Sequence, residues 1–234
     1  MEIAIEAWGD LACFTRPEAK VERFSYPVPT PSAARGILDA IYVKPIEFYW
    51  QINRIEVLHP IKYIALKRNE VKEVISSAAL KKAEKGAGEP PVIIADGTRD
   101  LTGSDAKGRT QRQTMALKNV HYRIFASIKP RKGFDNKLTA LYDQAMRRIE
   151  NGKCFYQPYF GCREFVAYFA PAGVSALTAV ESIDIGYMLY DVFDLGKVFI
   201  DNAKPFISVF RAQLDKGIMI VPEWTSNFVL KPEV

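Results

Sequence analysis

Alternating apolar and polar positions predict a series of β-strands along this chain. In the first of them, Ile3, Ile5 and Ala7 lie on one side of an extended backbone and the residues between them lie on the other. Gly9 and Asp10 are expected to end it. Later strands are favoured by β-branched and aromatic residues. The predicted strands are residues 2–8, 46–58, 61–66, 111–128 and 155–170, followed by shorter ones at 183–191, 206–210 and 218–221.

Three stretches favour helices instead. Apolar side chains at positions 34, 37, 38 and 41 form a stripe at helical spacing, which Thr30 or Ser32 can cap and Pro45 can stop. A second helix is predicted at 138–149 by the same periodicity. The charged, alanine-rich stretch at 70–84 favours a short third helix, and the glycine-containing polar stretch at 96–109 is expected to be a mobile arm or its tip.

The order of these elements predicts an α+β fold. Strand, helix, strand, inserted arm, strand, helix and strand follow one another, which is the arrangement of a ferredoxin-like or RNA-recognition-motif-like sheet. We therefore expect a ferredoxin-like domain at residues 1–171 that carries an inserted arm at about residues 67–110. Residues 172–234 are expected to form a small, mostly-β C-terminal domain.

Positive charge is concentrated in one part of the chain. The net charge of the 234 residues is +5, and the segment from Lys107 to Lys137 holds nine basic residues and one acidic residue. That segment therefore carries +8 and the rest of the chain −3. A run of one sign is commonly a solvated face, but it equally suits a surface that binds nucleic acid.

Several classes of site and location are disfavoured by composition. The three cysteines make no CxxC pair, so neither a disulfide framework nor a zinc site is indicated, and a reducing cytoplasm suits them. The sequence contains no Walker loop, GxGxxG, GxSxG or HExxH motif, and its only histidines are His59 and His121. No leader and no membrane span are expected, nor any metal or other cofactor.

The edge of the first predicted helix offers candidate chemistry. Arg35 and Tyr42 are seven residues apart and share a face, and Asp39 can pair with Arg35. Tyr42 is either a half-buried aromatic residue with a wet hydroxyl or a group that faces a ligand. One reaction needs no metal: the 2′-hydroxyl of RNA attacks the adjacent phosphorus while a base takes its proton and cations stabilise the phosphorane. Nearby lysines are expected to lower the pKa of Tyr42 toward that use.

Several segments in the same order resemble the Cas5 family of CRISPR-associated proteins, specifically its type I-C member. They cover most of residues 1–171, whereas the remainder matches less distinctly. The matching segments are WGDLACFTRP from Trp8, YPVPTPSAARGILDAIYVKP from Tyr26, RNEV from Arg68, LKNVHY from Leu117 and RRIENGKCFYQPYFGCREF from Arg147.

This resemblance implies a metal-independent endoribonuclease that cuts CRISPR repeat RNA. In the family, a tyrosine at the end of the first helix takes part in cleavage, and Tyr42 matches it. The family also has a Lys-His pair that opens the second helix. Lys137 matches the lysine, but the histidine has no counterpart here, and His121 could replace it only if its strand lies near Tyr42.

The resemblance also implies partners. We expect the chain to bind precursor and mature CRISPR RNA, to stay on the 5′ handle and to join the backbone and large subunits of a type I-C surveillance complex, with a possible contact to double-stranded DNA. The alternative is a binding subunit that caps the 5′ handle without cutting it. The cations expected to contact RNA are Arg16, Lys20, Arg23, Arg35, Arg68, Arg109, Arg112 and Lys118.

Overall fold

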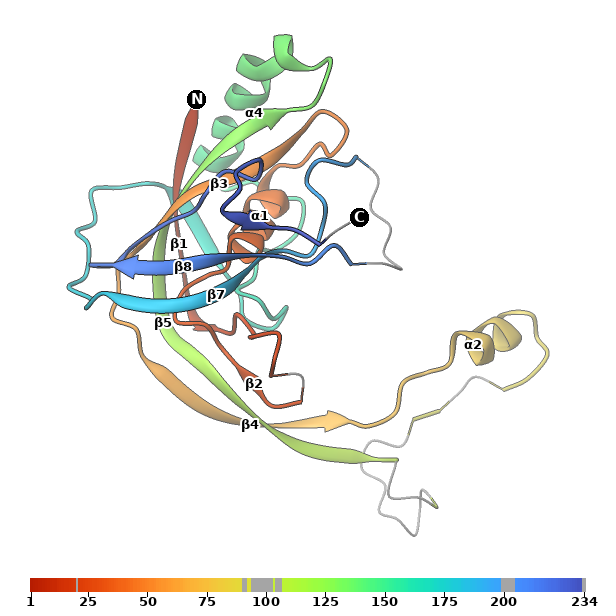
Figure 1. Ribbon diagram of the computed structural model, residues 1–234. Helices are drawn as coiled ribbons and strands as arrows, with labels where there is room; N and C mark the ends of the chain where they lie inside the picture. The colour runs from red at the N-terminus through yellow and green to blue at the C-terminus, as the bar shows by residue number, and fades with distance from the viewer. Residues whose placement is uncertain (20, 90–91, 94–102, 104–106, 199–204, 233–234) are drawn as a thin grey trace. The chain divides into compact units, whose positions relative to one another are not determined.

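The computed structural model (Figure 1) describes residues 1–19, 21–89, 92–93, 103, 107–198 and 205–232. It divides into two compact units, one of residues 1–64 with 115–234 and one of residues 65–114. Most of the predicted mobile arm at 96–109 lies outside the described residues. No helix among the described residues is long and apolar enough to cross a bilayer.

A mixed α/β architecture around a large antiparallel sheet organises the fold. Four of its strands follow the spatial order β6-β1-β5-β3, and every neighbouring pair among them is antiparallel. These strands are β1 (Glu2–Ala12), β3 (Phe48–Val57), β5 (Arg109–Pro130) and β6 (Tyr168–Pro171). Because β1 and β3 both run antiparallel to β5, they are parallel to each other, and the helix between them connects them across one face.

Two helices supply apolar side chains to the core. α1 (Pro31–Ile41) buries Ala34, Ile37, Leu38 and Ile41, as the apolar stripe predicted. Its start is capped by Thr30, whose side chain accepts a hydrogen bond from the Ala33 amide at 3.1 Å. α4 (Leu138–Glu150) buries Leu141, Ala145 and Ile149 and follows the short 3₁₀ turn η1 (Asp135–Lys137). The predicted helices at both positions are therefore present.

The C-terminal strands extend the sheet. β7 (Ile183–Asp191) and β8 (Ser208–Asp215) pair antiparallel, β9 (Ile218–Ile220) joins β8 to β3, and β10 (Val229–Leu230) pairs with β8. Residues 172–234 belong to the same compact unit as residues 1–64. The small C-terminal domain expected at residues 172–234 stays a prediction.

Gly9 does not end the first strand, contrary to expectation. It pairs with Val120, and β1 continues to Ala12. A side chain at this position would lie 2.5 Å from the carbonyl oxygen of Val166 and 3.1 Å from the ring of Phe160. The glycine therefore allows a loop to pack directly against the strand, which is a tertiary requirement and not a turn signal.

The segment expected to be a strand at 155–170 is mostly a packed loop. Only β6 at its end is extended, and Gly161 takes a left-handed conformation with φ 78°. Phe160, Phe165 and Ala167 are nevertheless buried. Their burial produces the apolar pattern without a continuous strand.

The unit of residues 65–114 contains parts of two strands and one helix. β4 (Tyr63–Val71) pairs with β5, and α2 (Ser77–Glu84) follows it. The predicted helix at 70–84 therefore starts seven residues later, because Glu70 and Val71 continue the strand. In the larger unit, β2 (Arg23–Phe24) also pairs with β5.

Candidate active site

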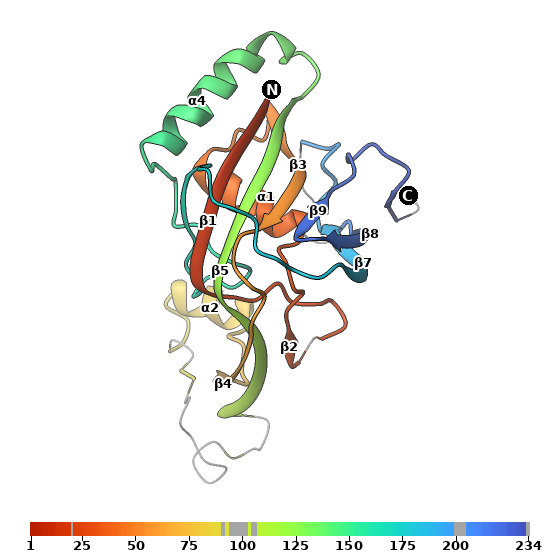
Figure 2. The same ribbon diagram turned by 90° about the vertical axis from the view of Figure 1, so that its left-hand side faces the viewer.

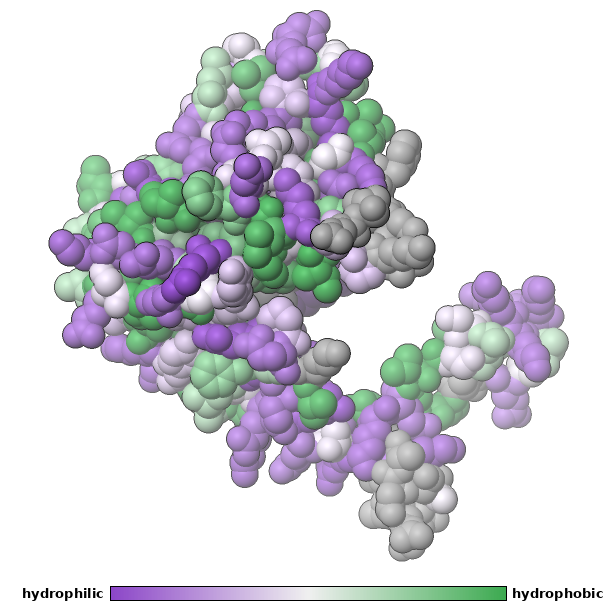
Figure 3. Space-filling view, in the orientation of Figure 1, coloured by the Kyte–Doolittle hydropathy of each residue, from purple (hydrophilic) through white to green (hydrophobic). Residues whose placement is uncertain are grey.

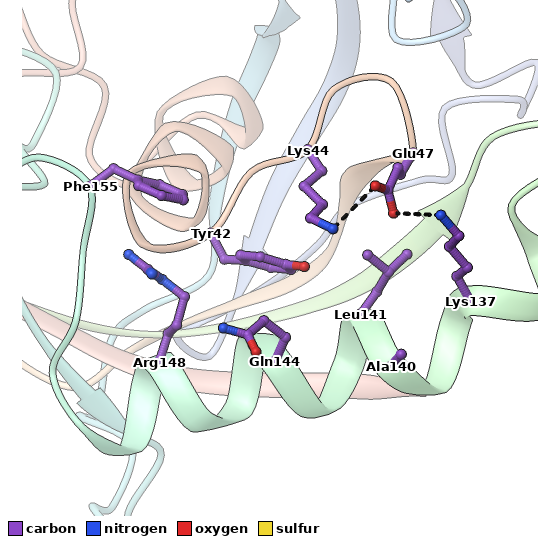
Figure 4. A pocket seen from close by; sticks show the side chains of 9 residues that line it. All are labelled: Tyr42, Lys44, Glu47, Lys137, Ala140, Leu141, Gln144, Arg148 and Phe155. Carbon is purple, nitrogen blue, oxygen red and sulfur yellow. Dashed lines mark hydrogen bonds and ion pairs between the residues drawn. The ribbon is translucent and has the colours of Figure 1, made fainter.

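A pocket of about 350 Å³ brings the C-terminal end of α1 together with the start and inner face of α4 (Figure 4). It contains both Tyr42 and Lys137, which are 95 positions apart in the sequence. Three cations and one phenol line it. The full lining is Tyr42, Lys44, Glu47, Lys137, Ala140, Leu141, Gln144, Arg148 and Phe155.

The end of α1 fixes the phenol of Tyr42. Its amide still donates to the Leu38 carbonyl at 2.8 Å, but its backbone is extended, with φ −153° and ψ 119°. Its carbonyl accepts a hydrogen bond from Nε1 of Trp50 at 2.8 Å, and its ring lies 5.5 Å from that of Phe48. Tyr42 is thus 4% exposed and held by main-chain and ring contacts, with its hydroxyl directed into the pocket (Figure 4).

Lys44, Glu47 and Lys137 form a charged rim on one side of this phenol. Nζ of Lys44 donates to Oε1 of Glu47 at 3.1 Å, and Nζ of Lys137 lies 3.8 Å from Oε2 of the same carboxylate. That second oxygen is buried and accepts no hydrogen bond from any residue in the described part of the chain. One carboxylate therefore orients two ammonium groups that come from different elements.

Arg148 closes the other end of the pocket. Its Nε donates to the carbonyl of Ile41 at 2.5 Å, and its guanidinium lies over the ring of Phe155 with 4.2 Å between the central carbon and the ring centroid. These contacts use one N–H of the guanidinium and one of its faces. Its remaining N–H groups are geometrically able to donate to an anion.

Burial favours the protonated form of the phenol. It is the largest influence on the pKa of Tyr42 and raises it above the ordinary value of 10, while the charge of Lys44 opposes this and that of Glu47 adds to it. Lys44 in turn has a raised pKa, chiefly because Glu47 accepts its hydrogen bond. The expected lowering of the Tyr42 pKa by lysines is therefore outweighed. At neutral pH, Tyr42 is a proton donor and Lys44 is a cation.

His121 does not line this pocket. It lies on β5, opposite Trp8 of β1, and its Nε2 is 3.1 Å from a carboxylate oxygen of Glu6. Burial lowers the pKa of His121, and the Glu6 charge opposes that shift. The condition under which this histidine could replace the missing family residue, a position beside Tyr42 in the same pocket, is therefore not met.

Arg16 and Arg23, two of the cations expected to contact RNA, line a separate pocket of about 370 Å³. The Arg16 guanidinium lies 4.7 Å from the ring centroid of Tyr26 and 3.6 Å from Glu18. Arg23 donates to Sγ of Cys162 at 3.0 Å. Lys20 lies outside the described residues. The structure brings Arg16 and Arg23 together without connecting them to the Tyr42 pocket.

Arg35 has a different environment from the one expected for an RNA contact. Its side chain is 13% exposed and makes a two-bond ion pair with Asp191, from Nε at 2.7 Å and from Nη2 at 3.1 Å, and it also hydrogen-bonds Asp39. These two carboxylates occupy three of its donors. Arg35 therefore joins α1 to the end of β7 and does not present its guanidinium to solvent.

The remaining predicted contacts lie along β4 and β5. Arg68, Arg109 and Arg112 belong to the unit of residues 65–114, where Nε of Arg112 is 3.4 Å from a carboxylate oxygen of Glu70. Arg109 is exposed. Lys118, in the larger unit, is exposed on β5, and its amide donates to the carbonyl of Lys62 at 2.9 Å.

Sequence reasoning missed Lys44, Glu47 and Arg148 as pocket residues. A signal for Lys44 was present, because the residue before a proline favours an extended backbone, Lys44 precedes Pro45, and residues two apart in an extended backbone point to the same side. Arg148 lies one turn from Gln144 and two from Leu141 on α4, so a helical projection places all three on one side. Only the packing of α4 beside the end of α1 could reveal Glu47 between the two lysines.

Metal chemistry was expected to be absent. Within the described ranges, no group of three or more His, Cys, Asp or Glu residues is placed to hold an ion. The pocket itself offers one carboxylate, one phenol and three cations. A site with this composition attracts an anionic group such as a phosphodiester.

Comparison with known proteins gives a consistent family. The family model described as CRISPR-associated protein (Cas_Cas5) matches residues 2–221. A protein of Mannheimia succiniciproducens named CRISPR pre-crRNA endoribonuclease Cas5d is 40% identical over 239 residues, covering 97% of each chain. A protein of Thermus thermophilus with the same name is 38% identical over 190 residues, covering 81% of this chain and 72% of the relative.

Solved structures share the fold at low sequence identity. The crystal structure of a CRISPR-associated protein has a TM-score of 0.62 at 17% identity and covers 98% of this chain and 96% of that one. A functionally uncharacterized protein from Streptococcus mutans has a TM-score of 0.61, also at 17% identity, with coverage of 98% and 97%. A chain from a CRISPR RNA-guided surveillance complex has a TM-score of 0.50 at 15% identity, with coverage of 95% and 90%.

Proposed function

This chain belongs to the Cas5d family of CRISPR-associated proteins, and we propose that it cleaves CRISPR repeat RNA within a precursor transcript, without a metal, by attack of the RNA's own 2′-hydroxyl. The names of the relatives at 38–40% identity, pre-crRNA endoribonuclease, support RNA cleavage as its activity. The observation that carries the mechanism is the pocket in which a protonated Tyr42 lies among Lys44, Lys137 and Arg148.

The chemistry of this pocket suits the departure of the leaving group. The 2′-oxygen forms a bond to phosphorus, the bond from phosphorus to the 5′-oxygen breaks, and the products are a 2′,3′-cyclic phosphate and a 5′-hydroxyl. Tyr42 gives its proton to the departing 5′-oxygen, because its raised pKa keeps it protonated. Lys44, Lys137 and Arg148 stabilise the extra negative charge of the phosphorane.

The 2′-hydroxyl proton goes to solvent in this proposal. Neither histidine of the chain lines the pocket, and the Glu47 oxygen that accepts no hydrogen bond within the described residues is buried. Without a positioned base, the reaction depends on hydroxide and is slow compared with a site that contains a general base, which commonly contributes about 10²- to 10⁴-fold.

We further propose that the core is ferredoxin-like and that the chain remains on the 5′ handle in a type I-C surveillance complex with backbone and large subunits. The strand order β6-β1-β5-β3, with a helix after β1 and another after β5, supports the first point. The fold that this chain shares with a chain of a CRISPR RNA-guided surveillance complex supports the second. The basic segment of residues 107–137 supports binding of RNA. The proposal also includes a contact between this chain and double-stranded DNA.

A second candidate function is a subunit that caps the 5′ handle without cutting. The specific observation in its favour is the placement of His121, which is bonded to Glu6 and not in the Tyr42 pocket. Both functions require RNA binding, so only a cleavage assay distinguishes them.

The decisive experiment incubates the purified protein with its own repeat RNA in EDTA, beside the same RNA with a single 2′-deoxy substitution 5′ of the cut. Cleavage of the first RNA alone, with a cyclic phosphate on the upstream product, is expected. In parallel, Lys137→Ala is expected to slow cleavage about 10²-fold, whereas Lys132→Ala, an exposed lysine outside the pocket, leaves it unchanged. Tight binding without cleavage in any condition would favour the capping subunit.

A further inference from the structure

Four aromatic rings form a row across the larger unit, and none of them belongs to the Tyr42 pocket. Tyr168 on β6 lies 6.3 Å from Trp8 on β1, with 29° between their planes. Trp8 lies 5.8 Å from His121 on β5, and His121 lies 5.2 Å from His59, just beyond β3. The strand register produces this row, because Trp8 is directly opposite both Tyr168 and His121.

The row lies on the face of the sheet that does not supply the core. Ile3, Ile5 and Ala7 are buried on one face of β1, and Trp8 alternates to the other. Figure 2 views β1, β5 and β3 with α1 behind them. Trp8 is 38% exposed and Tyr168 is 54% exposed, so the two largest rings of the row are open to solvent.

Hydrogen bonds hold the histidine end of the row in place. His121 is fixed by Glu6 at 3.1 Å, and Nδ1 of His59 lies 3.2 Å from the carbonyl oxygen of Asn119. The two rings meet nearly perpendicularly, at 88°. The row is therefore built from positioned side chains and is open at the Trp8 and Tyr168 end.

We propose that this row is a second RNA site, where Trp8 and Tyr168 stack on the bases of a single-stranded segment. The choice of RNA rests on the proposed function, but the stacking role does not depend on cleavage in the Tyr42 pocket. Neighbouring aromatic rings on the exposed face of a sheet suit unpaired bases, because every base has a π-face and the bases of a duplex are already stacked.

Charges around the row favour bases over phosphates as the group recognised. Arg123 donates to Glu6 at 2.9 Å and to Glu56 at 3.0 Å, and Arg54 lies 3.2 Å from Glu56, so two guanidinium groups compensate the two carboxylates within the protein. Glu6 also accepts from Ser175 at 3.0 Å. The space-filling view in Figure 3, in the orientation of Figure 1, shows hydrophilic and hydrophobic residues interspersed over the face turned to the viewer. In the row itself, Asp10 is exposed two positions after Trp8 on the same strand. Binding here should therefore depend on salt much less than binding by a cationic surface does.

The chain contains its own reporter for this site. Of its three tryptophans, Trp50 is 1% exposed and Trp224 is 5% exposed, which leaves Trp8 as the accessible one. Intrinsic fluorescence is measured while a single-stranded uridine RNA of about eight nucleotides is added to the full chain. An abasic ribose-phosphate oligomer of the same length and a blunt duplex serve as controls. We expect the uridine RNA alone to quench emission and to protect Trp8 from acrylamide.

Variants separate stacking from general binding. Trp8→Ala is expected to weaken binding of the uridine RNA about 5- to 100-fold, measured by anisotropy, and Trp8→Phe much less. Tyr168→Ala should reduce quenching while leaving the thermal midpoint unchanged. Lys137→Ala is expected to slow cleavage and to keep the quenching of Trp8 by the uridine RNA. Quenching without cleavage would therefore support the stacking site independently of the proposed function. Equal quenching by the abasic oligomer, or no protection from acrylamide, would overturn the proposal.

Discussion

Glu47 holds Lys44 through a 3.1 Å hydrogen bond, and the same carboxylate lies 3.8 Å from Lys137. This carboxylate organises the pocket and also competes with a phosphodiester for both lysines. The two effects can be separated, because orientation of the lysines affects the cleavage rate, whereas competition for their charge affects RNA affinity.

Glu47→Gln is expected to increase affinity for repeat RNA about 3- to 10-fold at low salt, since one negative charge leaves the rim of the pocket. The cleavage rate of bound RNA should fall, because neither lysine keeps a charged partner and the amide of glutamine offers only one acceptor oxygen. Binding and single-turnover cleavage measured on one preparation give both quantities. Glu223→Gln is the matched control, because Glu223 pairs with the exposed Lys129 outside the pocket. Weaker RNA binding by Glu47→Gln would show that orientation outweighs charge.

Tyr42→Phe tests the proton donor. The substitution keeps the ring contact with Phe48 and the main-chain bond to Trp50, so folding should be unaffected. Cleavage is expected to slow about 10²-fold. Tyr187→Phe, which changes a tyrosine that is 63% exposed and outside the pocket, should cleave at the unmodified rate. Equal rates for the Tyr42 variant and the parent chain would remove the hydroxyl from the mechanism.

The pH dependence of cleavage follows from the raised pKa of Tyr42. A donor with a raised pKa keeps its proton above the ordinary tyrosine value, and loses it only as the pH rises through the raised value. If hydroxide accepts the 2′-proton, the rate rises about tenfold per pH unit from neutrality and levels off only above about pH 10, where Tyr42 loses its proton. A single-turnover rate that instead reaches a plateau above about pH 6 to 7 would indicate a histidine base.

Local signals explain what could be predicted of the fold. The Thr30 cap and the apolar stripe are contained in consecutive residues, and α1 follows them. The prediction that Gly9 ends the first strand was wrong, because the absence of a side chain there allows Phe160 and Val166, more than 150 residues away, to pack against the strand. The aromatic and apolar residues at 155–170 misled as well, because most of them are buried in a loop and not in a strand.

The candidate site was accessible to prediction only in part. Tyr42 was singled out from its place at the edge of the first predicted helix, Lys137 was named from a family resemblance, and the structure places both in one pocket. The role of Arg35 could not be inferred, because its partner Asp191 is 156 positions away on β7. Helical spacing identifies only Asp39 as a partner of Arg35, and on that basis Arg35 was expected to be a cation at the surface.

Asp191→Asn is expected to destabilise the fold by about 3 kcal/mol, since Arg35 loses the buried one of its two charged partners and keeps only Asp39. Urea unfolding measures this change. The matched control is Asp184→Asn, which breaks the 2.7 Å pair with Arg211 at an exposed position and should leave the midpoint unchanged. A similar midpoint for both variants would mean that Asp39 alone satisfies Arg35. RNA affinity of the folded Asp191 variant should equal that of the parent chain.

Charge reversal at Arg109 and Arg112 tests the basic segment. Both residues lie on β5 in the unit of residues 65–114, and Arg109 is exposed. If each contacts one phosphate of single-stranded RNA, replacing both with glutamate should weaken binding at least tenfold at low salt. It should also reduce the slope of log affinity against log salt by about 1.4. Arg211→Glu, on the exposed face of β8, controls for net charge when it is compared with either single reversal, because each of these replacements changes the charge by −2. An unchanged slope in the double variant would place the RNA elsewhere and leave this part of β5 as a solvated face.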